Sequence, residues 1–142
     1  MGRMKATYKR LGLLLLVVGG LLAGCGEEIT TTRLPLGAAR NFLYHLQHGE
    51  LDDALTYWAP DYTPTDAREQ TGAAIARLRG VEVEYQKGEA ARQTDGTMDV
   101  TVRGRLRGGT GPWQEDQMIL RARLMERGPG WRVTSFTLVC CP

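Results

Sequence analysis

The chain has 142 residues, of which 42% are hydrophobic and 24% charged, and this length is enough for one domain with its own core. It carries 18 basic and 16 acidic residues, but four basic and no acidic residues lie within the first 25. The remainder therefore holds 14 basic and 16 acidic residues, a net charge of −2. A near-neutral domain lacks the basic surface that nucleic-acid binding requires, so we expect no nucleic-acid partner.

The first predicted element is an apolar segment over residues 11–26, which contains no charged residue. Its 16 residues are fewer than the roughly 20 that a membrane-spanning helix needs. Arg3, Lys5, Lys9 and Arg10 precede it, and small residues follow its leucine-rich centre. A basic start, an apolar centre and a small-residue end are typical of a secretory signal peptide.

The end of this segment, "LAGC" at residues 22–25, resembles the lipobox of bacterial lipoproteins. The resemblance implies that Cys25 is lipidated and becomes the mature N-terminus, which anchors the protein outside the cytoplasm to the bacterial cell membrane or outer membrane. Because Gly26 rather than Asp follows the cysteine, the family pattern favours the outer membrane where the cell has one. The implied parts are a lipoprotein signal peptide at residues 1–24, a lipidated tether at 25–34 and a folded domain at 35–142.

Apolar residues then recur at helical spacing in three segments, and the sequence predicts a helix in each. The first helix ends at Gly49, the second stops at Pro60, and the third starts at an N-cap within residues 63–66, with Pro64 at its first helical position. The apolar stripes are Ala39, Phe42, Leu43 and Leu46 in the first helix; Leu51, Ala54, Leu55 and Trp58 in the second; and Thr71, Ala74, Ile75 and Leu78 in the third.

After Gly80 apolar residues alternate with polar ones, which is the period of a half-buried β-strand. Turn signals at residues 94–96, 108–112 and 128–130 separate the alternating segments. Helices followed by a meandering sheet predict an α+β fold in which three N-terminal helices pack on a curved antiparallel sheet, an α+β roll. The predicted strands cover residues 81–85, 98–106, 118–124 and 131–139, with a short extra strand near residues 89–93.

Two stretches carry a family resemblance: "ARNFLYHLQHGELDDALTYWAP" at residues 39–60 and "GWRVTSFTL" at residues 130–138. With the strands between them, they resemble the nuclear transport factor two-like (cystatin-like) superfamily, and most closely its bacterial lipoproteins. The resemblance implies a cavity between the helices and the sheet. Some members of the superfamily are dehydratases, isomerases or cyclases that place Asp, His or Tyr in this cavity, and many others only bind or dimerise.

The predicted inner face of the sheet is apolar except at Tyr85. General acid–base catalysis near neutral pH needs a group with a pKa near 7, which a tyrosine does not supply. We therefore predict no catalytic residue on this face, and expect a binding or scaffold module whose cavity accepts an apolar small molecule or a protein partner. The inward positions are Val81, Val83, Tyr85, Met98, Val100, Val102, Gly104, Leu106, Met118, Leu120, Ala122 and Leu124.

Four aromatic or imidazole side chains are candidates for contacting such a ligand: Trp58, Tyr62, Tyr85 and His45. Trp58 at the end of the second predicted helix and Tyr62 after it lie where members of the superfamily often line the cavity mouth. His45 lies about 110° from the centre of the first apolar stripe and can reach the cavity edge. The alternative function is a small acid–base enzyme of dehydratase or isomerase type that uses His45, or Asp61 beside Tyr62.

The two histidines, His45 and His48, do not form a recognisable metal motif. They are three residues apart, and the pattern shows no nearby cysteine or matching carboxylate to complete a ligand set. The sequence also lacks the phosphate-binding loop, the nucleophile elbow, the zinc-protease helix and the paired-cysteine motif. We therefore predict no metal ion and no cofactor.

Arginines gather at alternating positions of two predicted strands, on the outer face of the sheet. Such a face can dock an acidic partner or lipid headgroups, because a guanidinium group binds carboxylate and phosphate groups through two hydrogen bonds. The alternative is a solvated face that Glu82, Glu84 and Asp99 partly neutralise across strands. The candidate partner surface consists of Arg103, Arg105, Arg121 and Arg123, with Arg107 on the same face.

Cys140 and Cys141 are adjacent at the end of the last predicted strand. Consecutive Cα atoms are about 3.8 Å apart, which is below the usual lower limit of about 4.4 Å for a disulfide. Three states stay open: free thiols, a labile disulfide between the two, or a bridge to a second copy that would give a homodimer.

Overall fold

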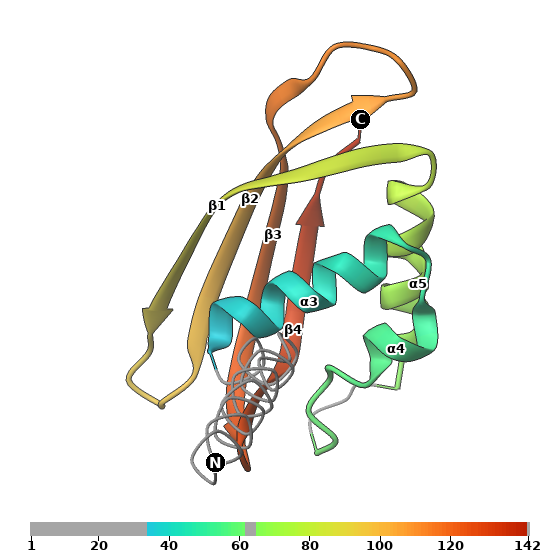
Figure 1. Ribbon diagram of the computed structural model, residues 1–142. Coiled ribbons are helices and arrows are strands. Elements are labelled where there is room, and N and C mark those ends of the chain that lie inside the picture. Colours follow the sequence, from blue (N-terminus) through green and yellow to red (C-terminus); the bar gives the residue numbers. More distant parts are fainter. Residues whose placement is uncertain (1–33, 62–64, 142) are drawn as a thin grey trace, which may run out of the picture.

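The computed structural model describes residues 34–61 and 65–141, and it has the predicted order of helices followed by strands (Figure 1). The predictions for the signal peptide, Cys25 and Tyr62 concern residues outside these ranges. Among the described helices none is long and apolar enough to cross a membrane. The elements are α3 (Pro35–Gln47), α4 (Leu51–Leu55), α5 (Ala67–Leu78), β1 (Val81–Arg92), β2 (Met98–Gly108), β3 (Gln114–Arg127) and β4 (Gly130–Val139).

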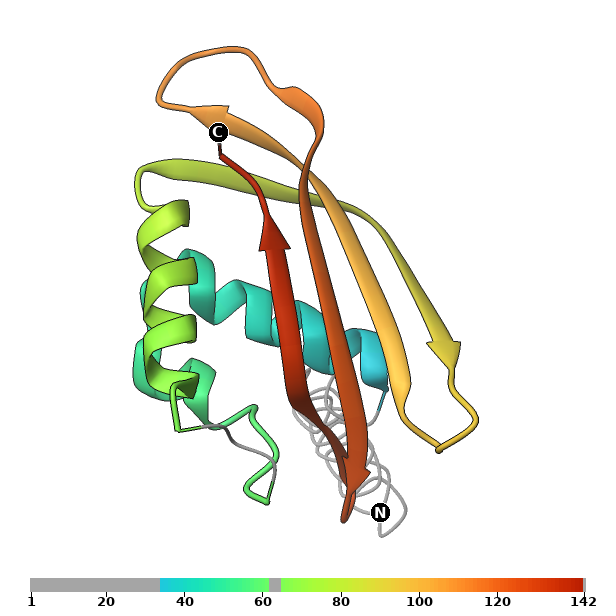
Figure 2. The ribbon, with the colours of Figure 1, turned by 180° about the vertical axis from the view of Figure 1, so that it is seen from behind.

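The four strands form one open antiparallel sheet in the order β1-β2-β3-β4, so each strand pairs with its neighbour in the sequence. Helix α3 crosses one face of this sheet and contacts all four strands, while α4 and α5 lie at one end of it (Figure 1). Seen from behind, the opposite face of the sheet carries no helix of the described residues (Figure 2). The domain is thus an α+β fold with one covered and one open sheet face.

The predicted helices are present, but two of them have different limits. Helix α3 buries its predicted stripe and ends at Gln47, two residues before the predicted stop at Gly49, whose φ of 70° favours glycine. Helix α4 ends at Leu55, whereas the apolar spacing predicted a helix as far as Trp58. The reason is that the backbone beyond α4 pairs with β4 instead: the Val133 N–H donates to Tyr57 O at 2.7 Å, and the Ala59 N–H donates to Val133 O at 2.8 Å.

Helix α5 begins at Ala67, after Asp66, rather than at the predicted Pro64. The backbone N–H of Gln70 donates to Asp66 O at 2.9 Å, and the Gln70 side chain donates to the Asp66 carboxylate, also at 2.9 Å. These bonds tie the first turn of the helix to Asp66. From its predicted stripe, Thr71, Ala74 and Leu78 are buried and Ile75 is half-buried.

Strand β1 is continuous from Val81 to Arg92, so it joins the predicted strand at 81–85 with the short extra strand predicted near 89–93. The register with β2 shifts between Tyr85 and Lys87, which is where the alternation of apolar residues breaks in the sequence. The inward positions agree with the prediction. Val81, Val83, Tyr85 and Met98 are half-buried, and the remaining eight, from Val100 to Leu124, are buried.

An aromatic cluster fills the space between α3 and β4. The ring of Phe42 lies edge-on to Phe136, with centroids 5.0 Å apart, and to Trp58, with centroids 6.4 Å apart. The indole Nε1 of Trp58 donates to Thr71 Oγ1 at 3.1 Å, and this hydroxyl donates to Ala67 O at 2.7 Å. Trp58 is only 3% exposed, so its polar atom is satisfied inside the core.

Side chains from the helices also reach the two outer strands. Gln47 donates through Nε2 to Val83 O on β1 at 3.1 Å. Arg77 of α5 donates to Leu138 O at 2.8 Å and to Cys140 O at 2.9 Å, at the end of β4. Cys140 is joined to Cys141 by a disulfide, one of the three states that the sequence left open, and their Cα atoms are 3.8 Å apart.

Candidate functional site

Ion pairs connect neighbouring strands on the open face of the sheet. Arg105 of β2 lies opposite Glu84 of β1, and its Nη2 donates to both carboxylate oxygens at 2.9 Å. Arg107 pairs with Glu82, with Nε 3.0 Å from Oε2. The hydrogen bonds to Glu84, followed by its charge and the contact with Glu115, raise the pKa of Arg105. Cross-strand pairing of the kind expected for a solvated face therefore occupies these two arginines.

Trp113 covers the same two arginines. The Cζ atoms of Arg105 and Arg107 lie 4.6 Å and 4.5 Å from the centre of its ring, within the range of a cation–π contact. Each guanidinium group is thus held by a carboxylate and by an aromatic face. This part of the sheet offers little free positive charge to a partner.

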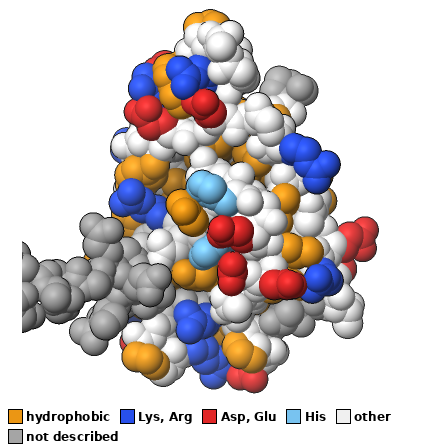
Figure 3. Space-filling model, turned by 45° about the vertical axis from the view of Figure 1, so that its right-hand side comes forward, with side chains coloured by type: hydrophobic (Ala, Val, Ile, Leu, Met, Phe, Trp, Pro, Cys, Tyr) orange, Lys and Arg blue, Asp and Glu red, His pale blue; other side chains and the backbone are white. Residues whose placement is uncertain are grey.

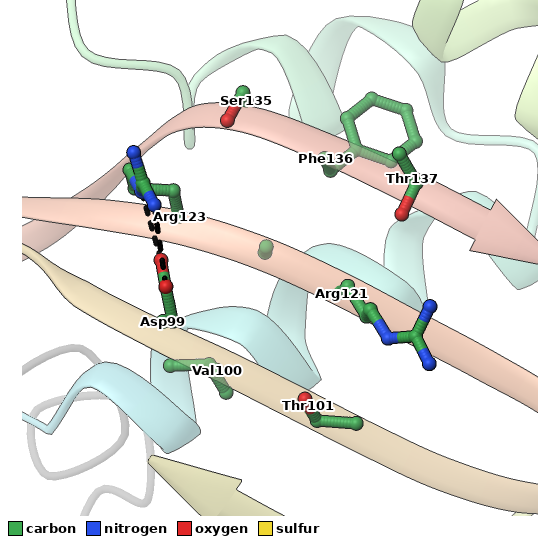
Figure 4. Close-up of a pocket in the computed structure, with 9 residues that line it drawn as sticks. Asp99, Val100, Thr101, Arg121, Arg123, Ser135, Phe136 and Thr137 are labelled. Carbon is green, nitrogen blue, oxygen red and sulfur yellow. Dashed lines mark hydrogen bonds and ion pairs between the residues drawn. The ribbon is translucent and has the colours of Figure 1, made fainter. Parts of the chain in front are cut away.

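A hollow of about 370 Å³ lies further along the open face, over β2, β3 and β4 (Figure 4). At one end Arg123 donates to Asp99 through Nε at 2.8 Å and through Nη2 at 3.2 Å. The hydrogen bonds to Asp99, together with its charge, raise the pKa of Arg123. The hollow is lined by Asp99, Val100, Thr101, Arg121, Ala122, Arg123, Ser135, Phe136 and Thr137.

Arg121 is the distinctive residue of this hollow. The register places it opposite Thr101 of β2 and Thr137 of β4, so its direct neighbours on the face carry hydroxyl groups and no carboxylate. Figure 4 shows its guanidinium group extended between these two strands and apart from the Asp99–Arg123 pair. The side chain is exposed, and it makes no hydrogen bond or ion pair within residues 34–61 and 65–141.

The predicted partner surface is therefore divided by the structure. Arg121 and Arg123 come together in the hollow, while Arg105 belongs to the paired group under Trp113. Arg103 lies on β2, opposite Lys87 of the edge strand, and its charge adds to that of Lys87 in lowering the pKa of Glu89. The hydrogen bond from Lys87 is the main cause of that shift.

The candidate cavity residues do not meet in one site. Trp58 packs inside the aromatic cluster, and Tyr85 is half-buried with the Arg40 guanidinium carbon 3.9 Å from its ring centre. His45 points toward α4 and lies beside Tyr57, with ring centroids 5.4 Å apart. Asp61, the other acid–base candidate, forms an exposed ion pair with Arg127 at 2.6 Å.

His45 belongs instead to a polar cluster that the sequence analysis did not find. Its Nδ1 donates to Glu50 Oε2, and ligand atoms of His45, Glu50 and Asp53 all lie within 4.8 Å of one another. Figure 3 shows this face, with histidine and acidic side chains adjacent on the surface. The two carboxylates follow the histidine by five and eight residues and lie across the turn at Gly49, so the periodicity of a single helix gives no signal for the cluster.

The comparisons with known proteins identify the fold. No family model and no curated protein matches the chain. A candidate ketosteroid isomerase from Shewanella frigidimarina matches with a TM-score of 0.52 and 16% identity, over 71% of this chain and 94% of that one. Aln2 from a Streptomyces species matches with a TM-score of 0.52 and 12% identity, over 72% of this chain and 85% of that one.

At these identities the likeness concerns the fold, and a shared fold is compatible with different functions. The open antiparallel sheet with helices on one face agrees with the α+β roll that the sequence predicts. Binding proteins and isomerase-type enzymes are both compatible with it. The domain has the ketosteroid isomerase-like, nuclear transport factor two-like fold.

Proposed function

We propose that the chain is a lipid-anchored extracytoplasmic module that binds an acidic protein partner through the hollow around Arg121. The observation that carries this proposal is the free guanidinium group of Arg121, which lies in the hollow without a partner among the described residues. On the same face Arg105, Arg107 and Arg123 are engaged by Glu84, Glu82 and Asp99. Arg121 thus has unused binding capacity inside the hollow, whereas Arg103, which also has no ion pair among the described residues, lies outside the hollow and opposite Lys87.

A carboxylate fits the chemistry of this hollow. Arg121 offers a planar set of N–H donors, and the hydroxyl groups of Thr101, Ser135 and Thr137 can donate from either side. Asp99 is the carboxylate among the lining residues, and Arg123 balances its charge. The hollow therefore has a net positive charge that favours an acidic side chain of a partner.

The inner face of the sheet supports binding over catalysis. Its polar group is Tyr85, which is covered by Arg40, and the aromatic cluster of Phe42, Trp58 and Phe136 fills the region next to β4. The alternative acid–base enzyme relies on His45 or on Asp61. His45 hydrogen-bonds to Glu50 on the helical side of the domain rather than facing the sheet, and Asp61 forms an exposed ion pair with Arg127. The outer hollow is therefore the better supported site.

The proposed location at the membrane rests on the N-terminal signal peptide segment. The lipobox-like residues 22–25 support lipidation at Cys25, and a tether of ten residues can extend by about 30 Å. Two or three acyl chains on one terminus anchor a protein stably, whereas a single chain is marginal. Anchored in this way, the domain would meet partners near the membrane surface.

Replacing Cys25 by serine tests the anchor. The variant will remain an uncleaved or soluble precursor, because serine has no thiol to carry the diacylglyceryl group. Membrane fractionation, and the mass of the N-terminal peptide, measure the outcome. A Cys25→Ser variant that is still processed and fully membrane-bound would refute the lipid anchor.

Charge reversal at Arg121 tests the binding surface. With the full-length chain purified in detergent, Arg121→Glu will weaken binding of a fluorescent hexaglutamate peptide by about tenfold, or about 1.4 kcal/mol. Arg121→Lys will keep part of the affinity, because lysine retains the positive charge but cannot form the bidentate hydrogen bonds of a guanidinium group. Fluorescence anisotropy at low salt measures both variants.

The matched control is Arg79→Glu, which makes the same charge change at the exposed residue that follows α5. Equal losses for the variants at Arg79 and Arg121 would mean that only net charge matters, and the proposed site would be wrong. Glycerophosphoglycerol, the soluble headgroup of phosphatidylglycerol, provides the second test, because the acyl anchor would hold the chain on any vesicle. Loss of headgroup binding in Arg121→Glu with unchanged peptide binding would identify a lipid headgroup as the occupant, in place of a protein carboxylate.

A further inference from the structure

We infer that His45, Glu50 and Asp53 bind a divalent transition-metal ion, with Zn²⁺ as the reference ion. This inference is independent of the hollow around Arg121, because the cluster lies on the helices α3 and α4 rather than on the sheet. It combines one imidazole with two carboxylates. Zn²⁺ binds imidazole nitrogen and carboxylate oxygen at about 2.0–2.2 Å.

The distances are close to those of a bound ion. The three ligand atoms lie within 4.8 Å of one another, whereas a tetrahedral Zn²⁺ with bonds near 2.05 Å separates its ligands by about 3.3 Å. Binding needs a rotation of side chains in which Glu50 moves slightly away from the His45 nitrogen that it now contacts. Asp53 is exposed and the Glu50 side chain is 39% exposed, so both can rotate.

His45 is the fixed member of the cluster. Its side chain is 21% exposed and lies between two tyrosine rings, with centroids 5.5 Å away for Tyr44 and 5.4 Å away for Tyr57. These contacts restrict the imidazole ring, and its Nδ1 already faces the Glu50 carboxylate. A metal ion would take the place of the proton that these two groups now share in their hydrogen bond.

The turn between the two helices places the carboxylates. The Glu50 N–H donates to His45 O at 3.0 Å across Gly49, and the Ala54 N–H donates to Glu50 O at 2.9 Å as α4 begins. Glu50 and Asp53 are three residues apart and therefore lie on the same side of the first turn of α4. The backbone thus holds all three side chains on one surface.

The charges of the cluster favour a cation. In the described part of the chain, neither Glu50 nor Asp53 forms an ion pair with lysine or arginine, and the nearby Arg68 pairs with Asp52 at 3.1 Å. Two carboxylates around one imidazole therefore lack a neutralising positive side chain. The imidazole favours zinc, cobalt, nickel or copper over calcium or magnesium, which prefer all-oxygen sites. Water can complete the coordination because the site is open to solvent.

The test measures metal binding by the full-length chain in detergent, after chelation and dialysis and without reductant, so that the disulfide stays closed. Isothermal titration with Zn²⁺ will give one site per chain, and Glu50→Gln, Asp53→Asn and His45→Gln will each weaken it by more than tenfold. Zn²⁺ will also raise the melting temperature of the wild-type chain and not that of His45→Gln.

The matched control is His48→Gln, because His48 lies just after α3, is exposed, and bonds through Nδ1 to Tyr44 O at 2.7 Å outside the cluster. This variant will bind Zn²⁺ like the wild type. The melting temperature without metal shows whether each variant is folded. A chain that binds no Zn²⁺, or that loses binding equally in His48→Gln and His45→Gln, would overturn the inference, and neither result would affect the test at Arg121.

Discussion

Replacing Phe42 by alanine will lower the free energy of unfolding by about 3–5 kcal/mol, which is the usual cost of removing a buried phenylalanine ring. Phe42 has no exposed surface and sits edge-on between Trp58 and Phe136, with centroids 6.4 Å and 5.0 Å away. Its loss removes an aromatic contact between α3 and β4 and leaves a cavity in the core. Urea unfolding followed by tryptophan fluorescence measures the change.

Tyr44→Ala is the control for this prediction. Tyr44 lies two residues from Phe42 on the same helix, but it is 51% exposed and its ring stacks on His48 at the surface. We expect its replacement to cost less than about 1 kcal/mol. Similar losses at Phe42 and Tyr44 would mean that helix propensity, and not the aromatic cluster, determines the stability of this region.

Gly104→Ala will destabilise the domain by about 1–3 kcal/mol, as overpacking of a well-packed core does, and Gly104→Val will destabilise it more. A Cβ atom at this position would lie 2.6 Å from the carbonyl oxygen of Glu84 and 2.9 Å from Cε of Met118. Met118 can move, but Glu84 O is backbone in the paired strand β1. The two strands must therefore separate or shift to accept even a methyl group.

Gly72→Ala provides the opposite case. Gly72 lies inside α5, and a Cβ atom there meets nothing within 4 Å. We expect a gain of about 0.5–1 kcal/mol, because alanine is the better helix former and restricts the unfolded chain. Thermal unfolding of the two variants compares the positions directly. A gain in stability at Gly104 would show that strands β1 and β2 do not approach each other as closely as the structure places them.

Local patterns account for what was predicted correctly. The stripe from Ala39 to Leu46 and the alternation from Met98 to Leu124 depend only on the period of each element, so the buried face of α3 and of the sheet followed from sequence. The length of α4 did not, because Trp58 leaves the helical spacing to pair with Val133, which lies far along the chain. Non-local hydrogen bonds of this kind leave no periodic signal.

The candidate sites likewise combine features that local sequence patterns predict with features that depend on the folded structure. Cross-strand pairs such as Glu84 with Arg105 could be anticipated from residues of opposite charge on one face. The absence of an ion pair at Arg121 among the described residues could not be anticipated, because it depends on the strand register, which places threonines and not carboxylates on both sides of Arg121. The cluster at His45 depends on the angle that the turn at Gly49 sets between two helices, which no spacing rule for a single helix describes.

The hydrogen bonds from Gln47 and Arg77 have a consequence for how copies of this protein behave in a crowded solution. An open sheet ends in two strands with unpaired backbone groups, and such edges can recruit further strands and grow into aggregates. Gln47 occupies a carbonyl oxygen of β1, and Arg77 occupies two along the end of β4. These side chains therefore obstruct the pairing of a further strand with either edge of the sheet at these positions. The open face of the sheet stays available for binding.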